Sequence, residues 1–393
     1  MANISSKPCI VVIHYRPLQE TTPVMTLLLK LKQFGYPVFY FSVESKPARD
    51  FLEKNSIPFE LLPRDESCYR MTRGLAKLRS RAKRGLGFLK RRGRLMSVLR
   101  SLSNQYDGNI IVWSQEFSGF GLAGNDILEF PRRIVTMFEM FEPNSRRWFG
   151  VDYERIMKTS TVVLPESNRA WILKAHLGLE QQPFVLENKL EPHPRTRNMP
   201  LPECAREAFE RIGNRPVFLF QGSWGADRKD IGMVLETIAR NRPNYCVVTM
   251  PVSDAARARL STYPNAFMLP FIPAPDHFAV TSHATVGLAF YSDNGTAPLQ
   301  RLNAIYCAPT KIYEYAGFGI PTLGNRLPGL VETIERHNAG ICCDVTEDSI
   351  LAAADRLLSG IGDYSRNATS FFETTNIDGQ INDILEHVKR LAI

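Results

Sequence analysis

A lysine and a glutamate three residues apart are the side chains of this sequence best suited to hold a ligand. Lys311 and Glu314 lie in CAPTKIYEYAGFGIPTLGNRLPGL (307–330), where Pro309 is typical of a helix start and the glycines that follow are typical of a helix end. The ammonium neutralises a phosphate, and the carboxylate accepts hydrogen bonds from two ribose hydroxyls. The pair therefore predicts a site for a nucleotide-sugar. The alternative is a surface ion pair, which stabilises a helix by only a few tenths of a kcal/mol.

A second candidate is the loop QGSWGADRKDIGM (221–233). Gly222 and Ser223 follow an apolar strand-like run, and Arg228 and Lys229 come just before a helical pattern. Small residues let the backbone approach a ligand closely, and the N–H groups of a helix N-terminus attract anions. The loop predicts a diphosphate site, and the alternative is an ordinary β–α turn with two solvated cations. No GxxxxGK[ST] pattern occurs in the chain, so P-loop chemistry is excluded.

Three carboxylates follow strand-like runs in the N-terminal half. Glu116 ends NIIVWSQE (109–116), and Glu139 and Glu142 lie in MFEMFEP. Parallel sheets place ligands beyond the carboxyl ends of their strands, so we expect the general base here, with Glu116 as first choice and Glu139 as second. The alternative for each is a solvated loop carboxylate. His14, at the end of the first strand, is a candidate substrate contact, although a lone histidine is more often structural.

Apolar runs and helical patterns alternate along the whole chain, which predicts parallel sheets with right-handed crossovers. A polar segment with four prolines (191–203) interrupts the rhythm, which then restarts. We expect an N-terminal domain over 1–195, a second domain over 205–372 and a terminal helical segment over 373–393. The expected strands fall at 8–15, 37–44, 58–63, 109–116, 132–141, 160–167, 183–188, 215–222, 245–251, 265–272 and 283–291.

The second half carries a recognisable motif, approximately Asn-x5-Pro-x-Lys-x-x-Glu-Tyr followed by Gly-x-Pro. It resembles the donor-site signature of group-1-like, nucleotide-sugar-dependent glycosyltransferases of the GT-B fold. The resemblance covers about residues 215 to 360, and the N-terminal half is similar only in rhythm. The residues that carry it are Asn303, Pro309, Lys311, Glu314, Tyr315, Gly319 and Pro321.

The resemblance implies two Rossmann-like domains with parallel sheets, the first binding the acceptor and the second the donor, and a C-terminal helix that crosses back to the first. It also implies that Glu314 binds the ribose and that Lys311 and Lys229 face the diphosphate. We add Phe271, near the end of an expected strand, to the donor site. The complete expected donor set is Gly222, Ser223, Arg228, Lys229, Phe271, Asn303, Lys311 and Glu314.

The activity implied is transfer of a hexose from a nucleoside-diphosphate sugar, with UDP the first choice, to a glycan or lipid-diphosphate-linked acceptor in surface polysaccharide biosynthesis. Neither a metal nor a cofactor is expected, since lysines and helix N-termini neutralise the diphosphate. The sequence departs from the family at Tyr306, where one version has a glutamate, and at Ser223, where an arginine is common. The stereochemistry of transfer is therefore left open, and a nucleotide-sugar epimerase of the same architecture remains an alternative.

The segment 67–106 contains twelve Lys or Arg residues and no Asp or Glu, so the net charge of +8 is concentrated there. Leucines alternate with the cations, and glycines interrupt the pattern, which predicts two or three short amphipathic helices. Such helices suit an anionic membrane or a lipid-linked acceptor. One alternative is a non-enzymatic protein that binds nucleic acid or another anion through this segment. The other is a solvated helical face. The cations assigned to this surface are Lys90, Arg91, Arg92 and Arg94.

The remaining composition is that of an ordinary globular chain. No run of eighteen apolar residues occurs, and the N-terminus lacks the pattern of a secretory signal. Seven scattered cysteines without a CxxC pair argue against a disulfide framework or a zinc site. We expect a cytoplasmic protein, peripheral at the inner face of the membrane, without nucleic acid as a partner.

Overall fold

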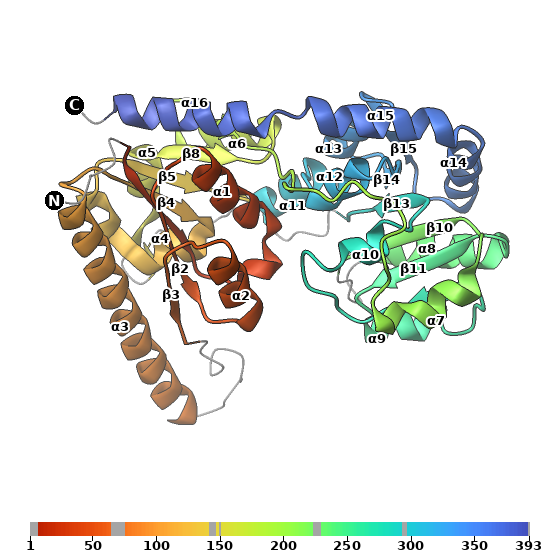
Figure 1. Cartoon of the computed structure of the whole chain (residues 1–393), viewed down its shortest axis with the longest axis horizontal. Coiled ribbons are helices and arrows are strands. Elements are labelled where there is room, and N and C mark those ends of the chain that lie inside the picture. The colour runs from red at the N-terminus through yellow and green to blue at the C-terminus, as the bar shows by residue number, and fades with distance from the viewer. Residues whose placement is uncertain are drawn as a thin grey trace. The chain divides into compact units, whose positions relative to one another are not determined.

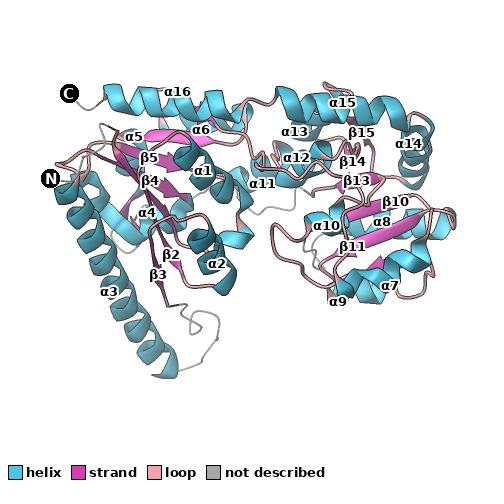
Figure 2. Cartoon of the chain, viewed as in Figure 1, coloured by secondary structure: helices cyan, strands magenta, loops and turns pink. Residues whose placement is uncertain are grey.

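The chain forms two compact units in the computed structural model, which describes residues 7–63, 75–140, 147–148, 151–222, 229–292 and 297–391. Unit 1 comprises Met1–Leu186 together with Asp378–Ile393, and unit 2 comprises Glu187–Ile377 (Figure 1). Each unit is built around one parallel sheet flanked by helices (Figure 2). The proline-rich segment 191–203 lies within unit 2.

Unit 1 contains a seven-stranded sheet in which every pair is parallel. The strand order is β3-β2-β1-β4-β5-β8-β9. All six residues of β1 are buried, as expected for a central strand that is covered on both faces. The strands are β1 (Cys9–His14), β2 (Val38–Val43), β3 (Phe59–Leu62), β4 (Ile110–Gln115), β5 (Arg133–Thr136), β8 (Thr161–Leu164) and β9 (Phe184–Val185).

Helices connect these strands, and a short antiparallel hairpin is made by β6 (Arg147–Trp148) and β7 (Val151–Asp152). The helices of unit 1 are α1 (Thr22–Gln33), α2 (Lys46–Lys54), α3 (Leu75–Gln105), α4 (Glu116–Ala123), α5 (Tyr153–Lys158), α6 (Ser167–Leu177) and the terminal α16 (Ile377–Arg390), with 3₁₀ turns at Leu18–Glu20 and Gly124–Glu129. The Lys30 ammonium on α1 pairs with the Asp378 carboxylate at 2.7 Å. The expected return of the terminal helix to the first domain is thus confirmed.

Unit 2 contains a six-stranded parallel sheet in the order β12-β11-β10-β13-β14-β15. Alternate residues of β10 enter two separate apolar clusters: Phe218 packs in one and Leu219 in the other. The sheet is therefore buried on both faces. Its strands are β10 (Val217–Gln221), β11 (Cys246–Met250), β12 (Ala266–Met268), β13 (Val286–Ala289), β14 (Thr322–Asn325) and β15 (Gly340–Cys343).

The helices of unit 2 pack on both faces of this sheet. They are α7 (Glu203–Ile212), α8 (Lys229–Asn241), α9 (Asp254–Leu260), α10 (Phe278–Thr281), α11 (Pro298–Ile305), α12 (Thr310–Gly317), α13 (Pro328–Leu330), α14 (Glu347–Ser359) and α15 (Ile361–Thr374), with a π-helical turn at Val331–Glu335. As expected, α12 starts directly after Pro309 and ends at Gly317.

The prediction that the basic segment forms two or three short helices is wrong, because α3 is one helix of 31 residues. Each glycine in a helix interior costs about 1 kcal/mol, which packing can offset. Leu95, Met96 and Leu99 are fully buried, and Arg100 pairs with Glu129 at 2.8 Å. The C-terminal half of α3 is thereby anchored to unit 1, while its first half extends away from the sheet (Figure 1).

Several strands are shorter than predicted, and two of them precede candidate site residues. Of the expected 132–141, only Arg133–Thr136 is strand, and of the expected 265–272, only Ala266–Met268. In both cases the apolar run continues past the last ladder hydrogen bond into a packed loop, which periodicity alone does not distinguish from strand. Glu139 and Phe271 therefore lie in loops that follow strand ends.

Candidate functional site

A buried polar cluster lies at the carboxyl end of β10 in unit 2. The Gln221 amide donates a hydrogen bond to the Glu314 carboxylate, and the Gln221 carbonyl oxygen accepts one from the Thr281 hydroxyl at 2.8 Å. His277 Nε2 lies 3.4 Å from Glu314 Oε1. Three elements thus supply the cluster: the end of β10, the region of α10 and the middle of α12.

Glu314 is only 5% exposed. This burial does not fit the surface ion pair that was the alternative for Glu314. Its backbone carbonyl also interacts with the His193 ring at 3.0 Å. Spacing along α12 could not reveal this burial, since Gln221 and His277 reach Glu314 only through the order of the strands. A carboxylate held by an amide and an imidazole keeps a fixed direction for binding hydroxyls.

Lys311 lies where the chain leaves β10. A Cβ placed on Gly222 would come within 3.0 Å of Lys311 Nζ, and Gly222 has φ 141°, a backbone conformation that favours glycine. The ammonium also lies 4.2 Å from the centroid of the Phe220 ring and 5.4 Å from that of Tyr291. The missing side chain at Gly222 thus leaves the ammonium close to the backbone, as an anion site requires.

The other expected donor residues lie on different elements of unit 2, and some lie outside the described residues. Asn303 lies on α11, and Phe271 is 60% exposed in the loop after β12. Lys229 is the first residue of α8. Ser223, Arg228 and the side chain of Lys229 lie outside the described residues.

In unit 1, Glu116 lies at the junction of β4 and α4 with φ 62°, in the left-handed region. A non-glycine residue there costs about 1–2 kcal/mol, and such strain concentrates at functional sites. Glu116 Oε1 accepts a hydrogen bond from the Phe138 N–H at 3.1 Å. Burial raises the pKa of Glu116 to about 7, and Glu139 adds to the rise, while Arg16, the Phe138 N–H and Arg169 oppose it.

The start of α4 packs directly against the ends of β1 and β4. A Cβ on Gly119 would lie 2.8 Å from both the Ile13 carbonyl oxygen and Ser114 Oγ. Since backbone atoms at this distance cannot give way cheaply, only glycine permits the contact. The helix thereby places Glu116 at the carboxyl edge of the sheet, where ligands of parallel α/β proteins bind.

Buried polar atoms gather at the same edge. His14 Nε2, Ser114 Oγ, Gln115 Nε2 and Ser118 Oγ have no hydrogen-bond partner among the described residues. His14 Nδ1 lies 3.0 Å from the Tyr40 hydroxyl, and burial lowers the pKa of His14 to about 3, so the ring is neutral. Polar atoms left unpaired in a native fold require water or a ligand to satisfy them.

Of the other residues predicted to be functional in unit 1, Glu139 is exposed three residues after β5, close enough to influence Glu116. Glu142 lies outside the described residues. On α3, Lys90 is exposed beside Leu89, and Arg91 is partly buried. Arg92 binds Asp126 through two nitrogens at 2.9 and 3.0 Å, and Arg94 pairs with Glu60. The last two cations are thus engaged within unit 1.

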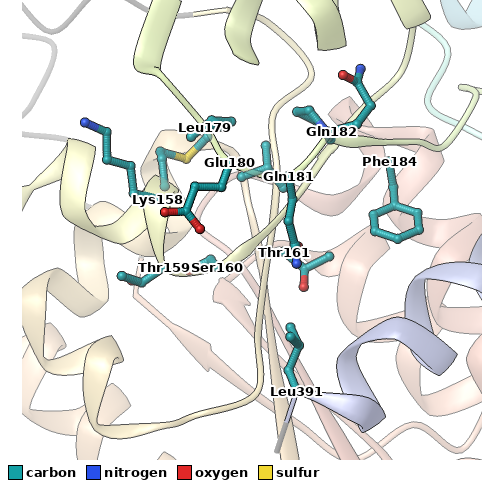
Figure 3. A pocket seen from close by; sticks show the side chains of 13 residues that line it. Lys158, Thr159, Ser160, Thr161, Leu179, Glu180, Gln181, Gln182, Phe184 and Leu391 are labelled. Carbon is teal, nitrogen blue, oxygen red and sulfur yellow. The ribbon is translucent and has the colours of Figure 1, made fainter. Parts of the chain in front are cut away.

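A pocket of about 160 Å³ lies at the opposite, amino-terminal edge of the same sheet. It is formed where α5 leads into β8, by the segment before β9 and by Leu391 (Figure 3). Lys158 and Glu180 are among its polar residues. The strands of this sheet run parallel, and Glu116 follows the carboxyl end of β4. The pocket therefore lies at the edge of the sheet opposite Glu116.

Two kinds of feature are absent from the part of the chain that the structure describes. No group of three His, Cys, Asp or Glu side chains there is arranged to hold a metal ion. Over the same residues, no helix has the length and apolar character needed to cross a membrane.

Sequence reasoning missed Gln221, His277 and Arg169. The signal for Gln221 was a polar residue ending an otherwise apolar buried strand. Arg169 lies in an ordinary helical run closed by Gly178, so nothing in the sequence indicated that it is buried.

No protein-family model matches the chain, and no curated protein matches it in sequence. Solved structures do match over nearly the whole length. A glycosyltransferase from Rickettsia africae ESF-5 aligns with TM-score 0.66 and 13% identity, covering 98% of this chain and 99% of that one. Anabaena Alr3699/HepE in complex with UDP and glucose aligns with TM-score 0.63 and 10% identity, covering 98% and 99%.

A UDP-N-acetylglucosamine 2-epimerase aligns with TM-score 0.59 and 14% identity, covering 97% of this chain and 95% of that one. These likenesses concern the fold, since the identities are low. Two parallel-sheet units, a terminal helix that returns to the first and full-length similarity to such enzymes together establish that this chain has the GT-B fold.

Proposed function

We propose that this protein is a glycosyltransferase that moves a hexose from a nucleoside-diphosphate sugar, with UDP as the nucleotide, to a glycan or lipid-linked acceptor. The observation that carries the proposal is the arrangement at the end of β10. There the Lys311 ammonium lies beside the backbone of Gly222, and the Glu314 carboxylate is held by Gln221 and His277. A cation for the diphosphate and a fixed carboxylate for the ribose hydroxyls are the two groups that a nucleotide-sugar requires.

In this mechanism Lys311 stabilises the negative charge that builds up on the diphosphate as the bond to the anomeric carbon breaks. Glu314 holds the ribose, and Phe271 offers a face for the base. Lys229, the first residue of α8, adds a backbone donor at a helix N-terminus. The reaction needs no metal ion in this scheme.

Glu116 is the residue to which we assign deprotonation of the acceptor hydroxyl. The acceptor oxygen then bonds to the anomeric carbon, the proton passes to the carboxylate, and the nucleoside diphosphate leaves. A pKa of about 7 suits a general base near neutral pH. In a retaining reaction, a phosphate oxygen of the donor would take the proton instead, and Glu116 would have another role.

We further propose that α3 binds an anionic membrane surface at the inner face of the membrane, as suits surface polysaccharide synthesis on a lipid-linked acceptor. Ten Lys or Arg residues and no acidic ones occur over 75–105. Arg92, Arg94 and Arg100 pair with acidic residues of unit 1, whereas Leu89 and Lys90 are exposed. The binding surface we propose includes Leu89, Lys90 and the cations that precede them in the sequence.

The test is a thermal-shift panel of UDP-, GDP-, ADP- and CMP-sugars on the purified chain. A ligand that binds only the native state raises the melting temperature, by an amount that grows with its concentration relative to Kd. We expect UDP and a UDP-sugar to raise it and the other nucleotides to have little effect. No shift with any nucleotide would overturn the proposal.

The second candidate is an epimerase, supported by the similarity to the UDP-N-acetylglucosamine 2-epimerase. The two are separated by incubating the chain with UDP-N-acetylglucosamine alone and following the sugar by proton NMR. A transferase leaves the sugar configuration unchanged, whereas an epimerase yields the 2-epimer without any acceptor.

A further inference from the structure

We propose that Arg169 is a positioning residue that holds Glu116 in place through the backbone carbonyl and N–H groups of Phe138. The inference rests on the proposed role of Glu116 for its catalytic meaning, but its structural content is independent of the substrate.

Two hydrogen bonds connect the side chains. Arg169 Nη1 donates to the Phe138 carbonyl oxygen at 2.6 Å, and the Phe138 N–H donates to Glu116 Oε1 at 3.1 Å. Both bonds involve the main chain of one residue in the loop after β5. The loop leaves the sheet after Met137, whose N–H still donates to the Val163 carbonyl oxygen, so side chains help to fix its direction. Arg169 does so from α6, and the loop in turn fixes the carboxylate.

Arg169 is itself firmly held. It is only 4% exposed, and it lies in the first turn of α6, where its N–H donates to Glu166 Oε2 at 2.8 Å. Burying a guanidinium is costly unless it is hydrogen-bonded, and the Phe138 carbonyl oxygen accepts one such bond from Arg169. Its charge also favours the ionised form of Glu116.

Three charged groups face Glu116 from the elements around it: Arg16 after β1, Glu139 after β5 and Arg169 on α6. Arg16 and Glu139 are exposed, so water screens them. Arg169 is buried, and its effect is therefore the one that the fold controls. It combines a charge that acts on the carboxylate with a hydrogen bond that orients the loop.

The test is an NMR titration of the full-length protein with ¹³C-labelled glutamate carboxyls and ¹⁵N-labelled phenylalanine. Glu116→Gln identifies the Glu116 signal. In the wild type, the chemical shifts of the Phe138 amide and of the Glu116 carboxyl should change with pH at the same midpoint. In Arg169→Met, the midpoint of the Glu116 carboxyl should move to a higher pH, because a favourable cation is lost, and the Phe138 amide should no longer follow it.

Arg169→Lys keeps the charge and should restore most of the midpoint, but it lacks the guanidinium that bonds the Phe138 carbonyl, so the pH response of the Phe138 amide should stay altered. It serves as the folded substitute if the methionine variant does not fold. Lys174→Met, on the same helix, is the matched control and should titrate like the wild type. The proposal would be overturned if both Arg169 variants keep the wild-type pH midpoint of the Glu116 carboxyl and the wild-type pH response of the Phe138 amide.

No substrate enters this titration, so its outcome does not depend on the transferase proposal. A shifted midpoint in Arg169→Met, combined with full turnover in Glu116→Gln, would uphold the link between Arg169 and Glu116 and reject the base role of Glu116.

Discussion

The Gln221 side-chain amide donates a hydrogen bond to the Glu314 carboxylate, and both residues are buried in unit 2. The carboxylate is thus part of the folded structure as well as a candidate ligand group. His277 lies on its other oxygen, with Nδ1 unpaired among the residues that the structure describes. Substitutions of Glu314 must therefore be interpreted for folding and for binding separately.

Glu314→Ala should lower the free energy of unfolding by about 1–3 kcal/mol, since it leaves the buried Gln221 amide without its acceptor. It should also abolish the rise in melting temperature caused by UDP. Urea unfolding and thermal shift measure the two effects. Glu314→Gln is the matched control: it keeps an acceptor oxygen and should fold more stably than the alanine variant, while binding UDP weakly. Normal UDP binding by both variants would refute the ribose role.

Glu116→Gln should lower kcat on the order of 10²–10⁴-fold, as for loss of a general base, with donor affinity unchanged. Wild-type turnover should rise with pH through about 7, because only the ionised carboxylate accepts the proton. Glu139→Gln is the control and should retain most turnover. If turnover in Glu116→Gln is normal, the anomeric configuration of the product by proton NMR decides whether a retaining reaction explains it.

Glu116 should also make stability depend on pH. Its pKa is raised from the ordinary value of 4.5 to about 7 in the fold, so folding disfavours the ionised form. Its contribution to stability is therefore fully present below pH 4.5 and is lost as the pH rises to about 7. Relative to the wild type, Glu116→Gln should gain stability across this window and keep the gain above it. Melting temperatures of both proteins from pH 4 to 8 test this, and a constant difference would contradict the raised pKa.

The α3 surface should bind anionic vesicles. Replacing Lys77, Arg79, Arg81, Lys83 and Arg84 by Gln should weaken sedimentation with phosphatidylserine-containing vesicles, by about 1 kcal/mol per cation that lies near the surface. Arg100→Gln is the control, because Arg100 pairs with Glu129. Neutral phosphatidylcholine vesicles should bind neither protein. Wild-type protein that ignores anionic vesicles at moderate salt would leave α3 as a solvated helix.

Much of the architecture was determined by the sequence alone. Apolar runs such as CIVVIH mark strands covered on both faces, and their alternation with helical patterns already specifies parallel sheets, because βαβ connections leave few other arrangements. The start of α12 at Pro309 and its end at Gly317 also follow from local chemistry. Glu116 was predictable as a strand-end carboxylate.

Only the tertiary structure decided the surroundings of these residues. Three features depend on contacts between segments that are far apart in the chain. They are the left-handed backbone at Glu116, the burial of Glu314 against Gln221, and the hydrogen bond from Arg169 to Phe138. The continuity of α3 was decided in the same way, since buried leucines and ion pairs outweigh the helix-breaking tendency of its glycines. Local patterns report the preference of each segment, whereas pKa values, hydrogen-bond partners and burial depend on which segments the strand order brings together.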